Sequence, residues 1–135
     1  MNLIGNWKGY YEYGDGYVLP QFGEKVMIFV NLQGNNDSFI GTVEEETSEH
    51  SIPLKATIKG FSQNDFISFV KTYPKIPRLK GIGSTEVIYD SGCLEIEHDG
   101  IIDSKHNAIY GSWTIIENGD IENAVYGTWL LKKLN

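Results

Sequence analysis

The chain has 135 residues, the length of one compact domain, so we expect residues 1–135 to fold as a single unit. Hydrophobic residues make up 41% of the sequence and charged residues 21%, a balance that excludes both wholesale disorder and a bundle of membrane-spanning helices. Eighteen acidic against eleven basic residues give a net charge of −7, which opposes general binding to nucleic acid or to an anionic membrane surface.

The composition favours strands over helices. The chain contains fifteen glycines, three tryptophans, eight tyrosines and six phenylalanines. Aromatic side chains fit a half-buried pleated surface, and glycines mark turns. The clearest period-two pattern alternates Ile52, Leu54, Ala56 and Ile58 with Lys55, Thr57 and Lys59. Similar runs predict further strands over about residues 3–13, 24–32, 37–46, 65–74, 84–97, 108–117 and 121–133.

Short segments with turn residues separate these eight predicted strands. They are Gly14-Asp15-Gly16, Gly34-Asn35-Asn36-Asp37, Gln63-Asn64-Asp65, Asp99-Gly100 and Asn118-Gly119-Asp120. Because connections this short make consecutive strands antiparallel, the sequence predicts an all-β, eight-stranded antiparallel up-and-down β-barrel. Closure of the sheet would also remove its exposed edges.

The predicted strand over residues 84–97 contains a change of phase. Val87 and Tyr89 face inward on one count, whereas Leu94 and Ile96 face inward on the other. One extra residue would resolve the conflict, and glycine accepts the backbone conformation that such an insertion needs. We therefore expect a β-bulge at Asp90-Ser91-Gly92.

A Gly-x-Trp pattern occurs three times. Tyr110-Gly111-Ser112-Trp113 and Tyr126-Gly127-Thr128-Trp129 repeat at a spacing of sixteen residues, and Gly5-Asn6-Trp7 precedes them near the start. Residues two apart in a strand share a face, so each glycine would leave space for the indole along its own strand. The three indoles would meet inside the barrel if the first strand pairs with the last.

The Gly5-Asn6-Trp7 element and the meander resemble the calycin group of small barrels, which includes lipocalins, fatty-acid-binding proteins and avidins. The two Tyr-Gly-x-Trp segments and the run over residues 69–74 are most similar to short single-domain barrels of uncharacterised function. The resemblance implies a lumen that could hold a small ligand. The arginine that lipocalins place near the chain end is missing, and Lys132 or Lys133 is the nearest substitute.

Other ligand signatures of the group are also missing. The only arginine is Arg78, so the Arg-x-Tyr carboxylate site of fatty-acid-binding proteins is absent. The biotin-site pattern of avidins is not recognisable, and no histidine follows His106 to serve as the haem ligand of a nitrobindin-like barrel. The resemblance therefore implies a fold more than a ligand.

Lys71 is the sharpest candidate for ligand binding. If Phe69 and Tyr73 point inward, period-two geometry sends Lys71 inward with them. A buried ammonium is costly unless it is paired or hydrated, so Lys71 would need a carboxylate from an acidic side chain or from a ligand. The alternatives are that this strand runs in the opposite phase or that Lys71 extends to the rim.

We predict that the lumen binds a small, partly apolar ligand, which could be anionic, and that it performs no chemistry. The residues predicted to line it are Trp7, Tyr11, Phe69, Lys71, Tyr73, Tyr89, Trp113 and Trp129. An eight-stranded barrel can also be filled by its own side chains. The protein would then act as a protein-interaction module through the basic, proline-rich loop 74–83 or the acidic strand end 44–49.

The loop 74–83 is the one basic patch of this acidic chain. Lys71, Lys75, Arg78 and Lys80 fall within ten positions, beside Pro74 and Pro77. Proline stiffens a connection and disfavours a central strand, so we expect an exposed segment, and a lid at one barrel mouth is one interpretation. The acidic run Glu44-Glu45-Glu46 is interpreted as a solvated strand end.

Enzymatic function is the least favoured class. The sequence has no hydrolase, metalloprotease, phosphate-loop or dinucleotide motif, and Cys93 reads as a packed or partly exposed residue rather than a nucleophile. His50, His98 and His106 match no metal-ligand spacing. We therefore expect no catalytic residue, metal or cofactor, a monomer or weak homo-oligomer, and, since one cysteine cannot form an internal disulfide and the N-terminus lacks a signal-peptide pattern, a cytoplasmic location.

Overall fold

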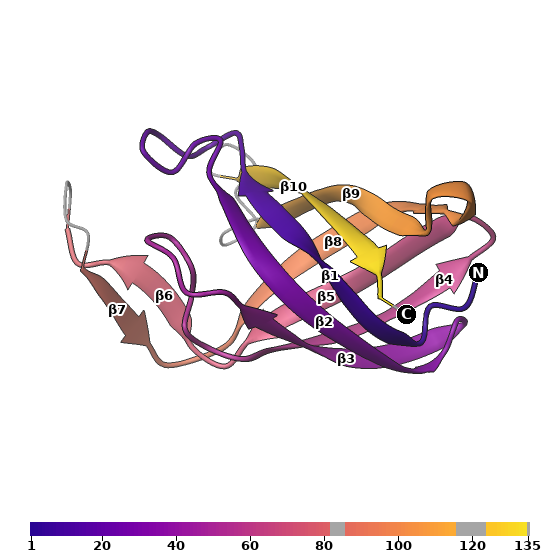
Figure 1. Ribbon diagram of the computed structural model, residues 1–135. Helices are drawn as coiled ribbons and strands as arrows, with labels where there is room; N and C mark the ends of the chain where they lie inside the picture. The colour runs from indigo at the N-terminus through magenta and orange to yellow at the C-terminus, as the bar shows by residue number, and fades with distance from the viewer. Residues whose placement is uncertain (82–85, 116–123, 135) are drawn as a thin grey trace.

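A computed structural model describes residues 1–81, 86–115 and 124–134, and shows a closed antiparallel barrel (Figure 1). Its strands are β1 (Gly5–Tyr13), β2 (Lys25–Asn35), β3 (Ser38–Glu45), β4 (Ala56–Gln63), β5 (Phe66–Tyr73), β8 (Leu94–Asp103), β9 (Ala108–Ile115) and β10 (Val125–Lys133). Two further strands, β6 (Ile76–Leu79) and β7 (Val87–Asp90), form a separate two-stranded sheet. Within the described residues, no helix is long and apolar enough to cross a membrane.

The barrel closes because the first strand pairs with the last. β1 and β10 run antiparallel, with Trp7 opposite Lys133 and Tyr11 opposite Trp129. The order around the barrel is β1-β10-β9-β8-β5-β4-β3-β2. Successive barrel strands are therefore neighbours, and β6 and β7 intervene along the chain between β5 and β8. The predicted fold class, an eight-stranded antiparallel up-and-down barrel, is confirmed.

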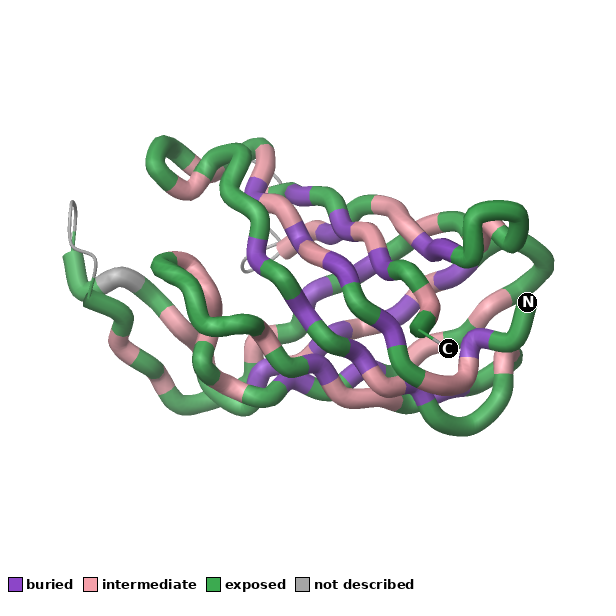
Figure 2. The backbone as a smooth tube through the Cα atoms, viewed as in Figure 1, coloured by how far each residue is buried: buried purple, intermediate pink, exposed green. Residues whose placement is uncertain are grey.

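Alternation of side chains along the strands fills the interior. On β2, Val26, Ile28, Val30 and Leu32 are buried, and the residues between them face outward (Figure 2). The same period places Trp7, Tyr11 and Tyr13 of β1 inside. Burying one side chain of this size stabilises the fold by about 1.5–3 kcal/mol, so the barrel interior is the hydrophobic core.

The predicted strand over residues 84–97 is divided between two sheets. Residues 87–90 form β7, which pairs with β6, and the next strand of the barrel, β8, begins only at Leu94. Gly92 has a positive φ of 107°, but it lies between two strands rather than in a bulge. The phase conflict therefore marks a change of sheet, and the bulge prediction is wrong.

The basic segment after β5 is also more regular than expected. Residues 76–79 form β6 despite Pro77, because the strand lies at the edge of a two-stranded sheet, where a missing backbone donor is tolerated. Figure 1 shows that the β6–β7 hairpin extends away from the barrel end rather than across it. The interpretation of this segment as a lid is therefore wrong.

The turn predictions differ in outcome. The predicted turn over residues 34–37 overlaps the end of β2, and residues 36–37 connect β2 to β3; Asn64 adopts a positive φ of 56° between β4 and β5. Asp99-Gly100 is not a turn, because both residues lie inside β8. Gly100 is required there for a different reason: a Cβ would lie 2.3 Å from the carbonyl oxygen of Tyr110. Asn118-Gly119-Asp120 lies outside the described residues.

The strand predicted from the alternation at residues 52–59 begins later than the pattern. β4 starts at Ala56, where Ala56 and Ile58 are buried and Thr57 and Lys59 are exposed. Residues 52 and 54 belong to the preceding loop and pack, partly buried, against the core. The alternation of apolar residues therefore begins in the loop before β4, where these residues pack against the core without being in a strand.

The Gly-x-Trp pattern works between strands rather than along one strand. Gly127 pairs with Trp113 across β9 and β10, and a Cβ on Gly127 would lie 2.1 Å from the Trp113 ring. The indole Nε1 of Trp113 donates to the Thr128 carbonyl at 3.1 Å, and that of Trp129 donates to the Ser112 carbonyl at 3.1 Å. The two repeats therefore fit into each other across β9 and β10.

The three indoles occupy different parts of the interior. Among ring contacts of the described residues, Trp113 packs edge-on to Tyr11 at 6.3 Å, Trp129 packs on Phe69 at 5.1 Å, and no indole pairs with another. Trp7 lies beneath Lys133, whose Nζ is 5.9 Å from the ring centre. The predicted pairing of β1 with β10 is present, but it does not bring the three indole rings into contact with one another among the described residues.

Candidate functional site

The two ends of the barrel are built differently, and the polar interior lies at only one of them. Short connections at residues 36–37, 64–65 and 104–107 close one end, near both termini (Figure 1). Loops 14–24 and 46–55 and the segment 74–93, which contains the β6–β7 hairpin, leave the other end. We call the first end, with its short strand connections, the hairpin end and the second the loop end; the β6–β7 hairpin lies at the loop end.

A buried ion pair lies beneath the loop end. The Nζ of Lys71 on β5 is 3.6 Å from Oε2 of Glu45, the last residue of β3, and the two side chains are 5% and 1% exposed. Removing an ammonium and a carboxylate from water costs several kcal/mol per ion, which only close pairing and further hydrogen bonds offset. The pair therefore depends on what else surrounds it.

The Glu45 carboxylate is surrounded by hydrogen-bond donors. Tyr11 donates its hydroxyl to Oε1 at 2.7 Å, and Tyr73 donates to Oε2. The backbone N–H of Ile52 also donates to Oε1, at 2.6 Å. Together with Lys71, these groups come from β1, β5 and the loop 46–55, so this one carboxylate joins three separate parts of the chain to β3. We call the four donors around Glu45, which are Tyr11, Lys71, Tyr73 and the Ile52 N–H, the carboxylate cradle.

Lys71 is held between aromatic faces as well as beside Glu45. Its Nζ lies 4.5 Å from the ring centre of Tyr11 and 4.6 Å from that of Tyr73, within the range of cation–π attraction. Burial lowers the pKa of Lys71 from 10.5 to about 8, and the neighbouring Glu45 opposes part of that decrease. The ammonium is still the main form at neutral pH.

The tyrosine hydroxyls of the cradle stay protonated well above pH 10. Burial is the main cause that raises the pKa of Tyr11 and of Tyr73, and the negative charge of Glu45 contributes to both. Burial also raises the pKa of Tyr13, which follows Tyr11 on the same face, to about 12. These groups therefore act as neutral hydrogen-bond donors.

Loop 46–55 covers the cradle. It is held by the Ile52 N–H bond to Glu45 and by the Tyr13 hydroxyl, which donates to the carbonyl of His50 at 2.9 Å. His50 Nδ1 lies 3.9 Å from Oε1 of Glu24, which is at the end of the neighbouring loop 14–24. The hydrogen bonds of Ile52 and His50 thus tie the loop to barrel side chains in or beside the cradle.

A second buried titratable group lies next to Lys71. His98 of β8 is stacked on Phe69 with ring centres 4.6 Å apart, and its Nδ1 donates to the Ile96 carbonyl at 3.1 Å. Burial, together with the charge of Lys71, lowers the pKa of His98 to about 3. His98 is therefore a neutral ring, and its Nε2 is an acceptor.

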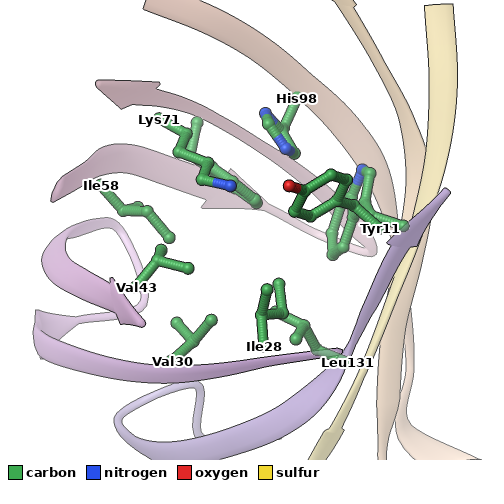
Figure 3. A pocket seen from close by; sticks show the side chains of 10 residues that line it. Tyr11, Ile28, Val30, Val43, Ile58, Lys71, His98 and Leu131 are labelled. Atoms are coloured by element: carbon green, nitrogen blue, oxygen red, sulfur yellow. The ribbon is translucent and has the colours of Figure 1, made fainter. Parts of the chain in front are cut away.

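The interior holds very little free space. The cavity between the side chains has a volume of about 10 Å³, enough for one water molecule (Figure 3). Its walls are Tyr11, Ile28, Val30, Val43, Ile58, Phe69, Lys71, His98, Trp129 and Leu131. In Figure 3 the Lys71 amine and the Tyr11 hydroxyl point toward each other across this space. This cavity is far smaller than known ligand pockets, which enclose several hundred Å³.

The structure places seven of the eight predicted lining residues inside the barrel. These are Trp7, Tyr11, Phe69, Lys71, Tyr73, Trp113 and Trp129. Tyr89 is on β7, 36% exposed, in the hairpin that extends from the loop end, so it cannot line the lumen. Its assignment followed from reading residues 84–97 as one barrel strand. Whether the seven buried residues bind a ligand stays a prediction.

Glu45 was missed, although the sequence contains its signal. Phe39 and Val43 are buried on β3, and the same period of two continues to Glu45. The run of three acidic residues favoured a solvated strand end, and Glu44 and Glu46 are indeed exposed. Glu45 instead supplies the carboxylate that an inward-facing Lys71 requires.

The remaining candidate groups lie on the surface. Cys93 is exposed between β7 and β8, and His106 is exposed with its ring 2.7 Å from Asp103. Within the described residues, no three histidine, cysteine, aspartate or glutamate side chains gather closely enough to hold a metal ion. A shallow groove of about 340 Å³ on the outer face is bordered by Asn6, Phe29, Asn31, Thr42, Glu44 and Leu134, with Trp7 and Val30 beneath.

Comparison of the chain with protein-family models, with curated proteins and with solved structures found no match. The function is therefore argued from the geometry of the barrel, the cradle and the β6–β7 hairpin.

Proposed function

We propose that the protein is a non-catalytic binding module in which a filled barrel presents the β6–β7 hairpin to an acidic, extended segment of a protein partner. The observation that carries the proposal is the separation of this hairpin from the barrel. Among the described residues, β6 and β7 pair only with each other, in a sheet of their own, and Figure 1 shows them extending beyond the loop end.

The hairpin has the properties of an unfinished sheet. Two-stranded hairpins are marginally stable by themselves in water, and a third strand supplies backbone hydrogen bonds and covers side chains. Val87 and Tyr89 on β7 are 40% and 36% exposed. An extended peptide that adds a strand along β7, which contains no proline, would complete the sheet.

The charge of the hairpin favours an acidic partner. Lys75, Arg78 and Lys80 are exposed on this segment, whereas the whole chain carries −7. Arg78 pairs with Asp90 at 2.6 Å and Lys80 with Glu86 at 3.5 Å, so the hairpin retains a small positive excess on an acidic protein. Such local complementarity steers association and selects partners more than it adds affinity.

Small-ligand binding is the second candidate function, and the calycin resemblance supports it. The eight-stranded meander and the position of Lys133 over Trp7 both agree with the calycin group. The filled interior speaks against an open lumen in this conformation. A ligand would have to replace side chains that now occupy the loop end.

The hairpin proposal can be tested with two synthetic peptides, an alternating glutamate–valine peptide and its lysine–valine counterpart. We expect the first to shift backbone amide NMR signals of residues 75–80 and 86–92, and the second to leave them unchanged. The double variant Arg78→Glu/Lys80→Glu should remove the response and leave the melting temperature within the range of surface substitutions, since both side chains are exposed.

The matched control is Lys59→Glu/Lys105→Glu, which makes the same charge change on exposed residues of the barrel. It should keep the response to the acidic peptide. Equal loss of binding in both double variants would show that net charge, rather than the hairpin, controls the interaction, and would contradict the proposal.

A further inference from the structure

We propose that the carboxylate cradle is a binding site for a short-chain carboxylate, and that Glu45 occupies it from within the chain while loop 46–55 is closed. The inference does not depend on the β6–β7 hairpin, because it concerns the polar groups buried inside the loop end. The ligand class follows from what the cradle offers, which is a set of donors converging on one carboxylate.

The donor set converges on a single carboxylate. Two tyrosine hydroxyls, one ammonium and one backbone N–H all meet the two oxygens of Glu45. Charge-assisted hydrogen bonds of this kind are shorter and stronger than neutral ones, and here they are made out of contact with water. If the Glu45 side chain withdraws, all of these donors lose their acceptor at once. A small carboxylate that enters the site would accept their hydrogen bonds again.

Glu45 is placed where it can withdraw. It is the last residue of β3, and the chain continues directly into loop 46–55. The bond from the Ile52 N–H to Glu45 ties the loop to the same carboxylate. Displacement of Glu45 by a ligand would therefore release one of the two inner anchors of the loop, and leave only the bond between Tyr13 and the His50 carbonyl.

The space beside the cradle limits the size of the ligand and favours an apolar tail. The water-sized cavity next to Lys71 and Tyr11 is lined by Ile28, Val43 and Ile58 among other apolar side chains. The Glu45 side chain itself has the shape of a propionate group. Its departure would add about that volume to the cavity, so a carboxylate with a short alkyl chain fits better than a long fatty acid.

The first test uses Glu45→Ala with sodium propionate as the probe. We expect the variant to be destabilised, because Lys71 is left buried without its carboxylate, and propionate to raise its melting temperature in a saturable way. The dissociation constant should be about 1 mM, as expected for a ligand of so few atoms. Glu45→Gln, which keeps the site filled, should show no saturable response, and Glu44→Ala, an exposed neighbour that keeps Glu45, should respond only as weakly as the natural chain.

If Glu45→Ala does not fold, the same titration is made on the natural chain and on Tyr73→Phe, followed by NMR. In the natural chain, propionate must compete with Glu45, so we expect binding that is about 10–100-fold weaker than in Glu45→Ala and that shifts the Ile52 amide signal. Tyr73→Phe, which removes a donor, should weaken it further.

Two results would overturn the proposal. One is a response in Glu44→Ala as large as that in Glu45→Ala, which would show a general salt effect. The other is a natural chain whose Ile52 amide does not respond to propionate at any concentration, which would make the cradle a purely structural ion pair. Neither result bears on the hairpin, whose test uses peptides and different residues.

Discussion

The hairpin end and the loop end of the barrel are covered by different kinds of groups. At the hairpin end, the N-terminal segment covers the core with Leu3, which is fully buried, and Trp7 donates its indole N–H to the Leu3 carbonyl at 2.9 Å. Asn36 in the β2–β3 turn accepts from the Leu3 N–H at 2.8 Å and donates to the Met1 carbonyl at 2.6 Å. Here an apolar plug is fixed by neutral hydrogen bonds.

At the loop end, a longer segment covers the barrel and is fixed by a buried charge. Glu45 and Lys71 are nearly inaccessible to water, and loop 46–55 lies above them through the Ile52 N–H. A buried ion pair is weak evidence for stability, because well-packed apolar residues of similar volume often stabilise as much or more. The two ends therefore differ in what covers them: an apolar side chain at one end, and a buried ion pair with its hydrogen bonds at the other.

The largest expected effect comes from removing one member of the ion pair. Lys71→Ala leaves the Glu45 carboxylate buried without its cation and should lower the free energy of unfolding by about 3–5 kcal/mol. Urea unfolding measures the change. The exposed pair of Lys55 and Glu44 provides the control, and Lys55→Ala should cost less than about 1 kcal/mol. Similar losses in the two variants would remove the distinction between buried and exposed pairs.

Leu3→Ala tests the apolar plug at the other end. The side chain is fully buried, so its truncation should cost about 2–5 kcal/mol through lost transfer energy and an added cavity. Unlike Lys71→Ala, this variant should show the same loss at every pH between 6 and 9. A loss that changes with pH would indicate that the two ends are coupled.

Between pH 8 and 9.5, Lys71 should be the main cause of the pH dependence of stability, and the buried tyrosines begin to oppose it toward pH 10. Its pKa is about 8 in the folded chain and 10.5 in the unfolded chain, so in this window the unfolded chain binds more protons. The free energy of unfolding should then rise with pH, by about 1–2 kcal/mol between pH 8 and 9.5.

Lys71→Met is the control for this prediction and should lack the rise. Above pH 10 the direction reverses, because Tyr11 and Tyr73 keep their protons in the folded chain while the unfolded chain loses them. A natural chain whose stability is level from pH 8 to 9.5 would mean that Lys71 is hydrated rather than buried.

The smallest effect is expected for Asn36→Ala. The substitution removes the acceptor of the Leu3 N–H and the donor to the Met1 carbonyl, and should cost about 1 kcal/mol. Hydrogen exchange at Leu3 should accelerate, while exchange at Ile52 above the cradle should not change. Faster exchange at both amides would show that the barrel opens as one unit.

Much of the barrel follows from local pattern. The alternation on β2 and on β5 predicts which side chains face inward, and it correctly sends Lys71 inward with Phe69 and Tyr73. Turn residues such as Asn64 mark the hairpins because few residues accept a positive φ. These features depend on a few neighbouring residues, which a sequence displays directly.

The errors arose where a local pattern has two structural meanings. Tyr89 alternates correctly within β7, but alternation does not state which sheet a strand joins. Asp99-Gly100 has the composition of a turn, whereas Gly100 is needed inside β8 because of the Tyr110 carbonyl on the adjacent strand. Each error concerns a contact with a strand distant in the sequence.

The fold class, the closure of the sheet and the need of a buried Lys71 for a carboxylate follow from the order of residues along the chain. That Glu45 supplies this carboxylate, that side chains pack the interior and that β6 and β7 lie outside the barrel is evident only in three dimensions. The physical reason is that side-chain direction within a strand is a local property, whereas the pairing of charges and the filling of space depend on which strands lie side by side.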